Sequence, residues 1–112
     1  MSPLKIMTET AATGPVLAVR GELDYANAGE LRELVAALAL RPGQRLVLDL
    51  TGLEFCDSSG ITALIAARHH AQAARADVAL AAVPAHTLRV LKIVGLDQIF
   101  AIHPDRETAV TS

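Results

Sequence analysis

The sequence has few aromatic residues and a single cysteine. Phe, Tyr and Trp make up 3% of the 112 residues, whereas hydrophobic residues make up 52%. The core must therefore be packed from Leu, Val, Ile and Ala, which suits helices laid on a sheet. Cys56 has no second cysteine with which to form an internal disulfide, and a lone thiol is best preserved in a reducing compartment. We expect a disulfide-free domain in the cytoplasm.

The sequence also has no strong excess of charge and no long apolar run. A formal net charge of -2 and a pI near 6.0 provide no basic surface for a phosphate backbone, which disfavours DNA and RNA as partners. The apolar runs "ITALIAA" and "VALAAV" are too short to span a membrane, and "MSPLKIMTET" lacks the apolar segment of a signal peptide. We expect one small domain that is neither exported nor membrane-bound.

The first half of the chain alternates between strand and helix patterns. "LKIMTE" and "PVLAVRGELD" predict an opening hairpin around the turn "AATGP". Asn27 and Glu30 have the spacing of a capping box, and the apolar residues that follow predict a helix over residues 28–40. "RPGQ" ends this helix, and "RLVLDL" is typical of a strand buried on both faces. The hairpin therefore leads into a central strand.

The second half continues the alternation. Ile61, Leu64 and Ile65 predict the buried face of a second helix, and "VALAAV" predicts another interior strand. "AHTLRVLKIVG" predicts a third helix that ends at a left-handed Gly95, followed by the strand "QIFAIH" and a terminal helix in "DRETAV". The resulting order is ββαβαβαβα. It predicts an α/β fold with a mostly parallel central sheet and an N-terminal antiparallel hairpin.

The turn "DSSG", Asp57 to Gly60, lies before the second helix and allows two interpretations. A side-chain oxygen at or next to the N-cap can accept a hydrogen bond from a free backbone N–H, so the turn can be a cap and no more. The same position suits phosphorylation of Ser58, because free N–H groups and the helix dipole tolerate a phosphate there. One cap is needed, whereas the turn offers three successive candidates.

Longer blocks of sequence carry a resemblance to a known family. "GELDYANAGELRELV", "LVLDLTGLEFCDSSGITAL" and "LRVLKIVGLDQIF", in this order and spacing, resemble the STAS domain of bacterial anti-sigma factor antagonists, also called anti-anti-sigma factors, over residues 4–110. The resemblance implies a single STAS domain and a regulatory function. Such a protein binds an anti-sigma factor, releases a sigma factor for transcription, and catalyses nothing itself.

The resemblance also implies roles for particular residues. It makes Ser58 the serine that is phosphorylated by the anti-sigma factor, which is itself a serine kinase, and dephosphorylated by a serine phosphatase. Phosphorylation then switches the binding off. The block that contains Asp24 matches a loop of the partner-binding surface. The partner-binding residues expected in this way are Asp24, Asp57, Ser58, Ser59, Gly60 and Ile61.

Other functions remain open at this point. Such domains also occur in stress-signalling scaffolds and as subunits of lipid transport systems, and these would have different partners. A serine hydrolase is disfavoured, because the Gly-x-Ser-x-Gly motif is absent and no histidine is placed by the sequence to activate Ser58. Glu22 and Asp24 lack further ligands for a metal, and the adjacent His69 and His70 point about 100° apart on a helix. We expect no metal and no cofactor, and solvated histidines.

Overall fold

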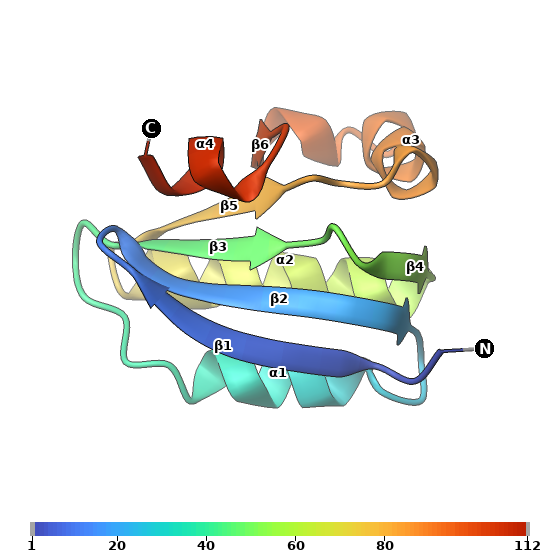
Figure 1. Cartoon of the computed structure of the whole chain (residues 1–112), viewed down its shortest axis with the longest axis horizontal. Helices are drawn as coiled ribbons and strands as arrows, with labels where there is room; N and C mark the ends of the chain where they lie inside the picture. The colour runs from blue at the N-terminus through green and yellow to red at the C-terminus, as the bar shows by residue number, and fades with distance from the viewer. Residues whose placement is uncertain (1, 112) are drawn as a thin grey trace.

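The computed structural model describes residues 2–111 and contains strands and helices in alternation along the chain (Figure 1). The elements in chain order are β1 (Lys5–Ala11), β2 (Gly14–Leu23), α1 (Ala28–Ala36), β3 (Arg45–Asp49), β4 (Leu53–Cys56), α2 (Ser58–Ala73), β5 (Asp77–Ala81), α3 (Ala85–Ile93), the 3-10 helix η1 (Leu96–Gln98), β6 (Ala101–His103) and α4 (Arg106–Thr111).

The strands form one mixed sheet. Its order is β1-β2-β3-β5-β6, with β4 also paired to β2. β1 and β2 are antiparallel, with Lys5 opposite Arg20 and Ala11 opposite Gly14, and the other pairs are parallel. The predicted hairpin, the central strand in "RLVLDL" and the mostly parallel sheet are therefore confirmed.

β4 is a strand that the sequence-based order lacks. After β3 the chain turns, the amide of Leu53 donates to the carbonyl of Leu50, and residues 53–56 then run beside the end of β2. β2 thus pairs with β3 along its first part and with β4 along its last part. Four residues are too few to show a period. The strand exists because the end of β2 offers unpaired backbone groups, and it delivers the "DSSG" turn directly beside that end.

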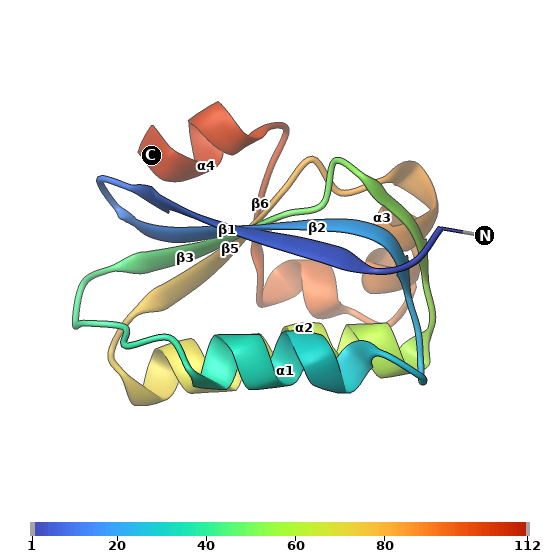
Figure 2. The same ribbon diagram turned by 60° about the horizontal axis from the view of Figure 1, so that its bottom comes forward.

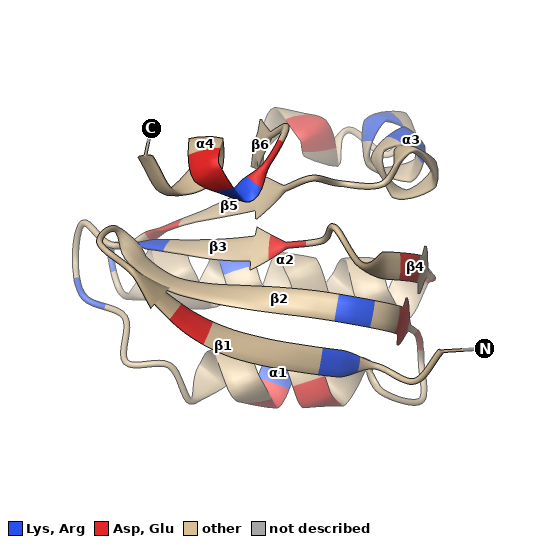
Figure 3. Cartoon of the chain, viewed as in Figure 1, with Lys and Arg blue, Asp and Glu red and all other residues tan. Residues whose placement is uncertain are grey.

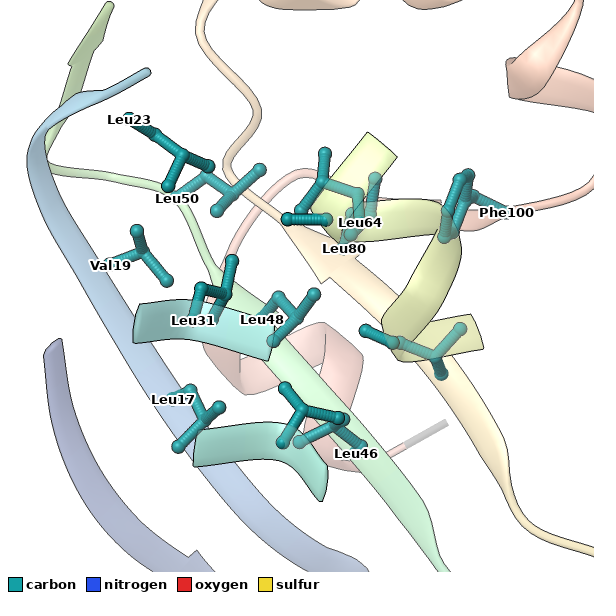
Figure 4. Packing of buried hydrophobic residues seen from close by; sticks show 14 of the residues in the cluster. Leu17, Val19, Leu23, Leu31, Leu46, Leu48, Leu50, Leu64, Leu80 and Phe100 are labelled. Atoms are coloured by element: carbon teal, nitrogen blue, oxygen red, sulfur yellow. The ribbon is translucent and has the colours of Figure 1, made fainter. Parts of the chain in front are cut away.

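One face of the sheet carries the large hydrophobic core. α1 and α2 lie side by side on this face (Figure 2). Leucines from strands and helices interdigitate there, as Figure 4 shows for Leu17 and Leu48 of the sheet, Leu31 of α1 and Leu64 of α2. Leu91 of α3 belongs to the same cluster. Apart from Phe100, the buried residues of this cluster are aliphatic, as the composition predicts.

The opposite face is covered by the short helix α4 (Figure 2). A small cluster forms between Ala109 of α4 and Val16, Val47 and Ala81 of the sheet. Arg106 begins α4 and donates from Nε to Asp49 Oδ2 at 2.9 Å and from Nη1 to Glu9 Oε2 at 2.8 Å. The guanidinium thus ties the terminal helix to β1 and β3.

The first helix begins at Ala28 as predicted, but its cap and its last residue differ from the prediction. α1 ends at Ala36 rather than residue 40, because Leu38 and Leu40 turn toward the core outside the helix. The capping box is wrong: Asn27 makes no side-chain hydrogen bond to α1. Its amide instead holds the preceding loop, as described below. Gly95 has φ 79 and directly precedes η1, so the left-handed residue expected after the third helix is confirmed.

Charged residues of both signs are spread over strands, loops and helices (Figure 3). This distribution agrees with the near-neutral composition, which disfavours a polyanionic partner. Over residues 2–111, none of the helices has the length and apolar character needed to cross a membrane.

Candidate functional site

Asp57, not a serine, caps α2. Its backbone is extended, with φ -91 and ψ -172, and its carboxylate Oδ1 accepts a hydrogen bond from the amide of Gly60 at 3.0 Å. An aspartate at this position satisfies one of the free N–H groups of the first helical turn and adds negative charge at the positive end of the dipole. Since the cap is already provided, neither serine is needed for it.

The same carboxylate also holds the loop between β2 and α1. Asp57 Oδ2 accepts from the amide of Tyr25 at 3.1 Å, and the amide of Asp57 donates to the carbonyl of Leu23 at 3.2 Å. Residues separated by 32 positions in the sequence are thereby joined. The "GELDYAN" loop and the "DSSG" turn form one surface, as the resemblance implied.

The loop is ordered by its own polar side chains. Asp24 Oδ1 accepts from the amide of Ala26 at 3.0 Å, and the amide of Asp24 donates to Asn27 Oδ1 at 2.9 Å. Asn27 Nδ2 donates to the carbonyl of Glu22 at 2.8 Å. Asp24 is half-buried, and its carboxylate accepts a hydrogen bond within the loop. It therefore helps to fix the conformation of the loop.

Ser58 and Ser59 are the first two residues of α2, and they line different hollows. Ser58 is exposed and Ser59 is half-buried. Within residues 2–111, no hydrogen bond of either hydroxyl was found, whereas the backbone carbonyl of Ser58 accepts from Thr62 Oγ1 at 2.9 Å. The Ser58 hydroxyl is therefore accessible and uncommitted.

Ser58 borders an apolar groove between α2 and α3. The groove has a volume of about 550 Å³. Val90 and Val94 remain 41% and 57% exposed on its α3 side, although both are apolar. The residues that line this apolar groove are Cys56, Asp57, Ser58, Ile61, Thr62, Ile65, Val90, Val94 and Leu96. Ile61 is 9% exposed, so it forms part of the groove floor rather than a protruding contact.

Ser59 borders a second depression, which lies between α1 and α2 and has a volume of about 430 Å³. We call it the polar hollow, because an arginine, a tyrosine and two hydroxyl-bearing residues share it. It is lined by Tyr25, Ala26, Ala28, Gly29, Arg32, Ser59 and Thr62. Thr62 lines both depressions, so the groove and the hollow lie on either side of the first turn of α2.

Gly60 permits close packing at the start of α2. A Cβ atom at this position would lie 2.6 Å from Cys56 Sγ and 3.0 Å from the carbonyl oxygen of Leu23. Any larger residue would push α2 away from β2 and β4. The glycine of the "DSSG" turn is buried, and it sets the distance between the serines and the neighbouring loop.

Cys56 is half-buried at the end of β4, as a small apolar residue would be. Burial, together with the nearby carboxylate of Asp57, raises the pKa of the Cys56 thiol to about 11. The thiol is protonated near neutral pH and is a poor nucleophile. A redox role for Cys56 has no support from this environment.

The histidines and acidic residues do not form a reactive centre in the part of the chain that the structure describes. His69 is exposed as expected, but His70 is half-buried, with Nε2 3.2 Å from the carbonyl oxygen of Leu38, so its prediction as a solvated residue is wrong. Between residues 2 and 111, no hydrogen bond joins a histidine to Ser58, and no group of three or more His, Cys, Asp or Glu side chains is placed to hold a metal ion.

The fold is that of a STAS domain, as solved structures of similar proteins show. The family described as "Mlab, STAS domain" matches residues 6–103. The chain belongs to the STAS domain family, and the resemblance drawn from its sequence blocks is confirmed.

Known relatives within this family include antagonists of anti-sigma factors. The chain is 29% identical to the anti-sigma-F factor antagonist RsfA of Mycobacterium tuberculosis, over 97% of this chain and 87% of RsfA. An anti-sigma factor antagonist from Mycobacterium paratuberculosis has a similar structure, with a TM-score of 0.85, 27% identity, and coverage of 97% of this chain and 92% of that one. The phosphorylated form of SpoIIAA from Bacillus has the same fold, with a TM-score of 0.74 and 19% identity over 95% and 96% of the two chains.

Two parts of the site were not predicted from the sequence. Val90 and Val94 lie in the segment predicted as the third helix, and "VLKIV" has apolar residues on more than one side of that helix. Tyr25 is 87% exposed beside Asp24, and Arg32 reaches the hollow from the next turns of α1. An exposed aromatic residue and an excess of apolar residues around a helix were the available signals.

Proposed function

We propose that this protein is an anti-sigma factor antagonist, which binds an anti-sigma factor with serine kinase activity and is switched off when Ser58 is phosphorylated. The unphosphorylated protein sequesters the anti-sigma factor and so frees a sigma factor for transcription. A serine phosphatase restores the active form. The proposed site of action is the cytoplasm.

The observation that carries this proposal is the division of labour between Asp57 and Ser58. Asp57 caps α2 through the Gly60 amide, and the exposed Ser58 hydroxyl has no hydrogen bond within residues 2–111. A hydroxyl that served the fold would be bonded and shielded. This one is accessible to a kinase, and its modification breaks no contact that the structure contains.

The position of Ser58 also suits a reversible switch. A phosphate there adds about -1.5 to -2 charges beside the Asp57 carboxylate, at the start of a 16-residue helix. The positive end of the helix dipole and its free N–H groups accommodate the anion without unfolding the helix. The effect therefore falls on the surface, where a partner would meet a charge in place of a neutral hydroxyl.

The apolar groove provides contact area next to the switch. Val90 and Val94 are exposed apolar residues on one side of it, and Ser58 lies on the other. Exposed apolar surface that is grouped beside polar groups is typical of a binding site. A partner side chain that fills this groove would lie next to Ser58. A phosphate on Ser58 would therefore weaken the contact of that side chain with the groove.

Substitution of Ser58 tests the switch. We expect the Ser58→Ala variant to retain an anti-sigma factor from the source cells, the Ser58→Glu variant to lose part of the affinity, and the phosphorylated protein to bind on the order of a hundredfold more weakly, since each ~1.4 kcal/mol of mismatch is a factor of ten. Calorimetry with the purified partner measures this. Phosphorylated and unphosphorylated forms within about threefold of each other would contradict the proposal.

Ser59→Ala is the matched control for the site of modification. Ser59 is half-buried in the polar hollow, whereas Ser58 is exposed. We expect phosphopeptide mapping to find the phosphate on Ser58 in both the wild type and Ser59→Ala, and to find none in Ser58→Ala. Modification mainly at Ser59 would overturn the assignment.

The identity of the protein that copurifies separates this function from a role as a scaffold or transporter-associated subunit. A soluble kinase-like protein that is retained by Ser58→Ala and released by Ser58→Glu supports the antagonist. A membrane ATPase complex that binds both variants equally would favour the transporter-associated role.

A further inference from the structure

The polar hollow contains an arginine without a counter-charge. Arg32 lies on α1 and lines the hollow. Within residues 2–111 the ion pairs are those of Arg106 with Glu9 and Asp49, and no hydrogen bond of the Arg32 guanidinium was found. Its five N–H donors are therefore available in a depression of about 430 Å³.

The hollow is open around Gly29. A Cβ atom added at Gly29 would meet nothing within 4 Å. Gly29 precedes Arg32 by three residues on the same helix, so the two positions are neighbours on its surface. On the other wall, the half-buried Ser59 provides a hydroxyl group, and the hydroxyl of the exposed Thr62 donates to the carbonyl of Ser58. The exposed Tyr25 forms the rim.

We propose that the polar hollow receives a carboxylate side chain of the anti-sigma factor, which pairs with Arg32 while Tyr25 packs beside it. This inference rests on the proposed function, and it adds the polar hollow to the apolar groove as a second contact region for the same partner. Because Thr62 lines both depressions, a partner that fills the groove and the hollow straddles the first turn of α2 and covers Ser58 between them.

The chemistry of the hollow selects a carboxylate on a protein. A planar guanidinium fork matches a carboxylate in a bidentate geometry, and tyrosine and arginine are the residues most enriched at binding hot spots. A nucleic acid is a poor occupant, because the chain carries a net charge of -2 and Arg32 is the one basic residue among those that line the hollow. A single carboxylate needs no further basic residue.

The test uses the full chain and the purified protein that Ser58→Ala retains and Ser58→Glu releases. We expect Arg32→Glu to weaken its binding by about thirtyfold or more, because an attractive charge pair becomes a repulsive one. Arg41→Glu changes the net charge equally at an exposed loop position outside both depressions, and we expect binding within about twofold of wild type.

A second pair of variants leaves Arg32 in place. Gly29→Glu supplies a carboxylate of the protein's own, three residues before Arg32, whereas Gly29→Gln adds a side chain of the same size without charge. We expect Gly29→Glu to bind about tenfold more weakly than Gly29→Gln, because the new carboxylate competes with that of the partner. Both substitutions are made at the same position on the surface of α1. Unchanged unfolding midpoints of the two variants would show that the fold is intact.

A charge exchange completes the test. Replacement of the facing partner Asp or Glu by Arg, located by cross-linking from position 29, is expected to restore binding of Arg32→Glu. If Ser58 controls binding but Arg32→Glu equals Arg41→Glu, or no acidic residue of the partner rescues it, the carboxylate contact is wrong and the proposed function stands. If no protein binds in a Ser58-dependent manner, both are wrong.

Discussion

The two faces of the sheet are stabilised by different kinds of contact. The face under α1 and α2 is a continuous and mainly aliphatic core, in which large side chains from both layers are fully buried. The face under α4 has a small cluster around Ala109 and depends in addition on the contacts of Arg106 with Asp49 and Glu9. Burial of apolar area stabilises the first face, whereas a directional ion pair positions the helix on the second.

This difference separates the stability of the domain from the attachment of its last helix. The leucine-rich face also carries the start of α2, so the site is built on the part of the molecule that is hardest to deform. α4 lies on the other side of the sheet from α1 and α2 (Figure 2). Changes at α4 should therefore alter stability with little effect on the site.

Neighbouring residues of β3 give the largest test of this comparison. Leu48 faces the aliphatic core and Val47 faces α4, and both are 0% exposed. We expect Leu48→Ala to lower the free energy of unfolding by about 3–4 kcal/mol and Val47→Ala by about 2 kcal/mol, because more apolar contact is lost on the core face. Urea unfolding measures both, and equal losses would contradict the comparison.

Two glycines test how closely each face is packed. A Cβ at Gly60 would meet Cys56 and the Leu23 backbone, whereas a Cβ at Gly52 would lie 2.7 Å from Cγ of the exposed and flexible Arg20. We expect Gly60→Ala to cost about 1–2 kcal/mol even after the gain in helix propensity, and Gly52→Ala less than about 1 kcal/mol. Chemical denaturation of the two variants is the measurement. A larger loss of unfolding free energy for Gly52→Ala than for Gly60→Ala would contradict the closer packing at the start of α2.

The ion pair on the α4 face predicts a pH dependence. Burial raises the pKa of Asp49, but hydrogen bonds from Thr51 and Arg106 outweigh it and hold that pKa below its usual 3.8. A depressed folded-state pKa contributes stability above pH 3.8, and this contribution is lost as the pH falls through the folded value.

Arg106→Gln removes the cation from this arrangement. We expect a loss of about 1–2 kcal/mol at pH 7, and the gap from wild type should narrow below about pH 4 as Asp49 becomes protonated. Arg89→Gln, at an exposed position of α3, is the control and should show no such narrowing. A gap that stays constant down to pH 2 would indicate that Arg106 acts through packing alone.

The last prediction concerns the reactivity of the Cys56 thiol beside the site, and it involves no change in stability. With a pKa of about 11, Cys56 should react with iodoacetamide at pH 7.5 on the order of a hundredfold more slowly than an ordinary thiol of pKa near 8.5. The rate should rise with pH past 10. Rapid alkylation at neutral pH would show that the start of α2 opens readily.

Most of the fold could be predicted because its elements have strong local patterns. "RLVLDL" and "VALAAV" are continuous apolar runs, and the hairpin and helices have clear periods. β4 could not be predicted, because four residues gain strand geometry only from the register with β2. The early end of α1 likewise depends on Leu38 and Leu40 turning toward the core, which is a tertiary effect.

The meeting of two segments of the chain could be predicted, but the division of roles between Asp57 and Ser58 could not. The "DSSG" turn and the Asp24 loop do meet, through the Asp57 carboxylate and the Tyr25 amide. No local rule decides whether Asp57 or Ser58 caps α2, because both side chains suit the position. The groove and the hollow arise where α3 and α1 approach α2, and their lining comes from residues far apart in the sequence.

The two hydrogen bonds of Asp57 have a consequence for the speed of recognition. Because one carboxylate fixes both the helix start and the neighbouring loop in the free protein, the entropy of ordering that loop is lost during folding and not during the encounter. A partner therefore meets a surface already in its binding shape, and association should proceed as a single bimolecular step whose rate constant follows solvent viscosity and ionic strength.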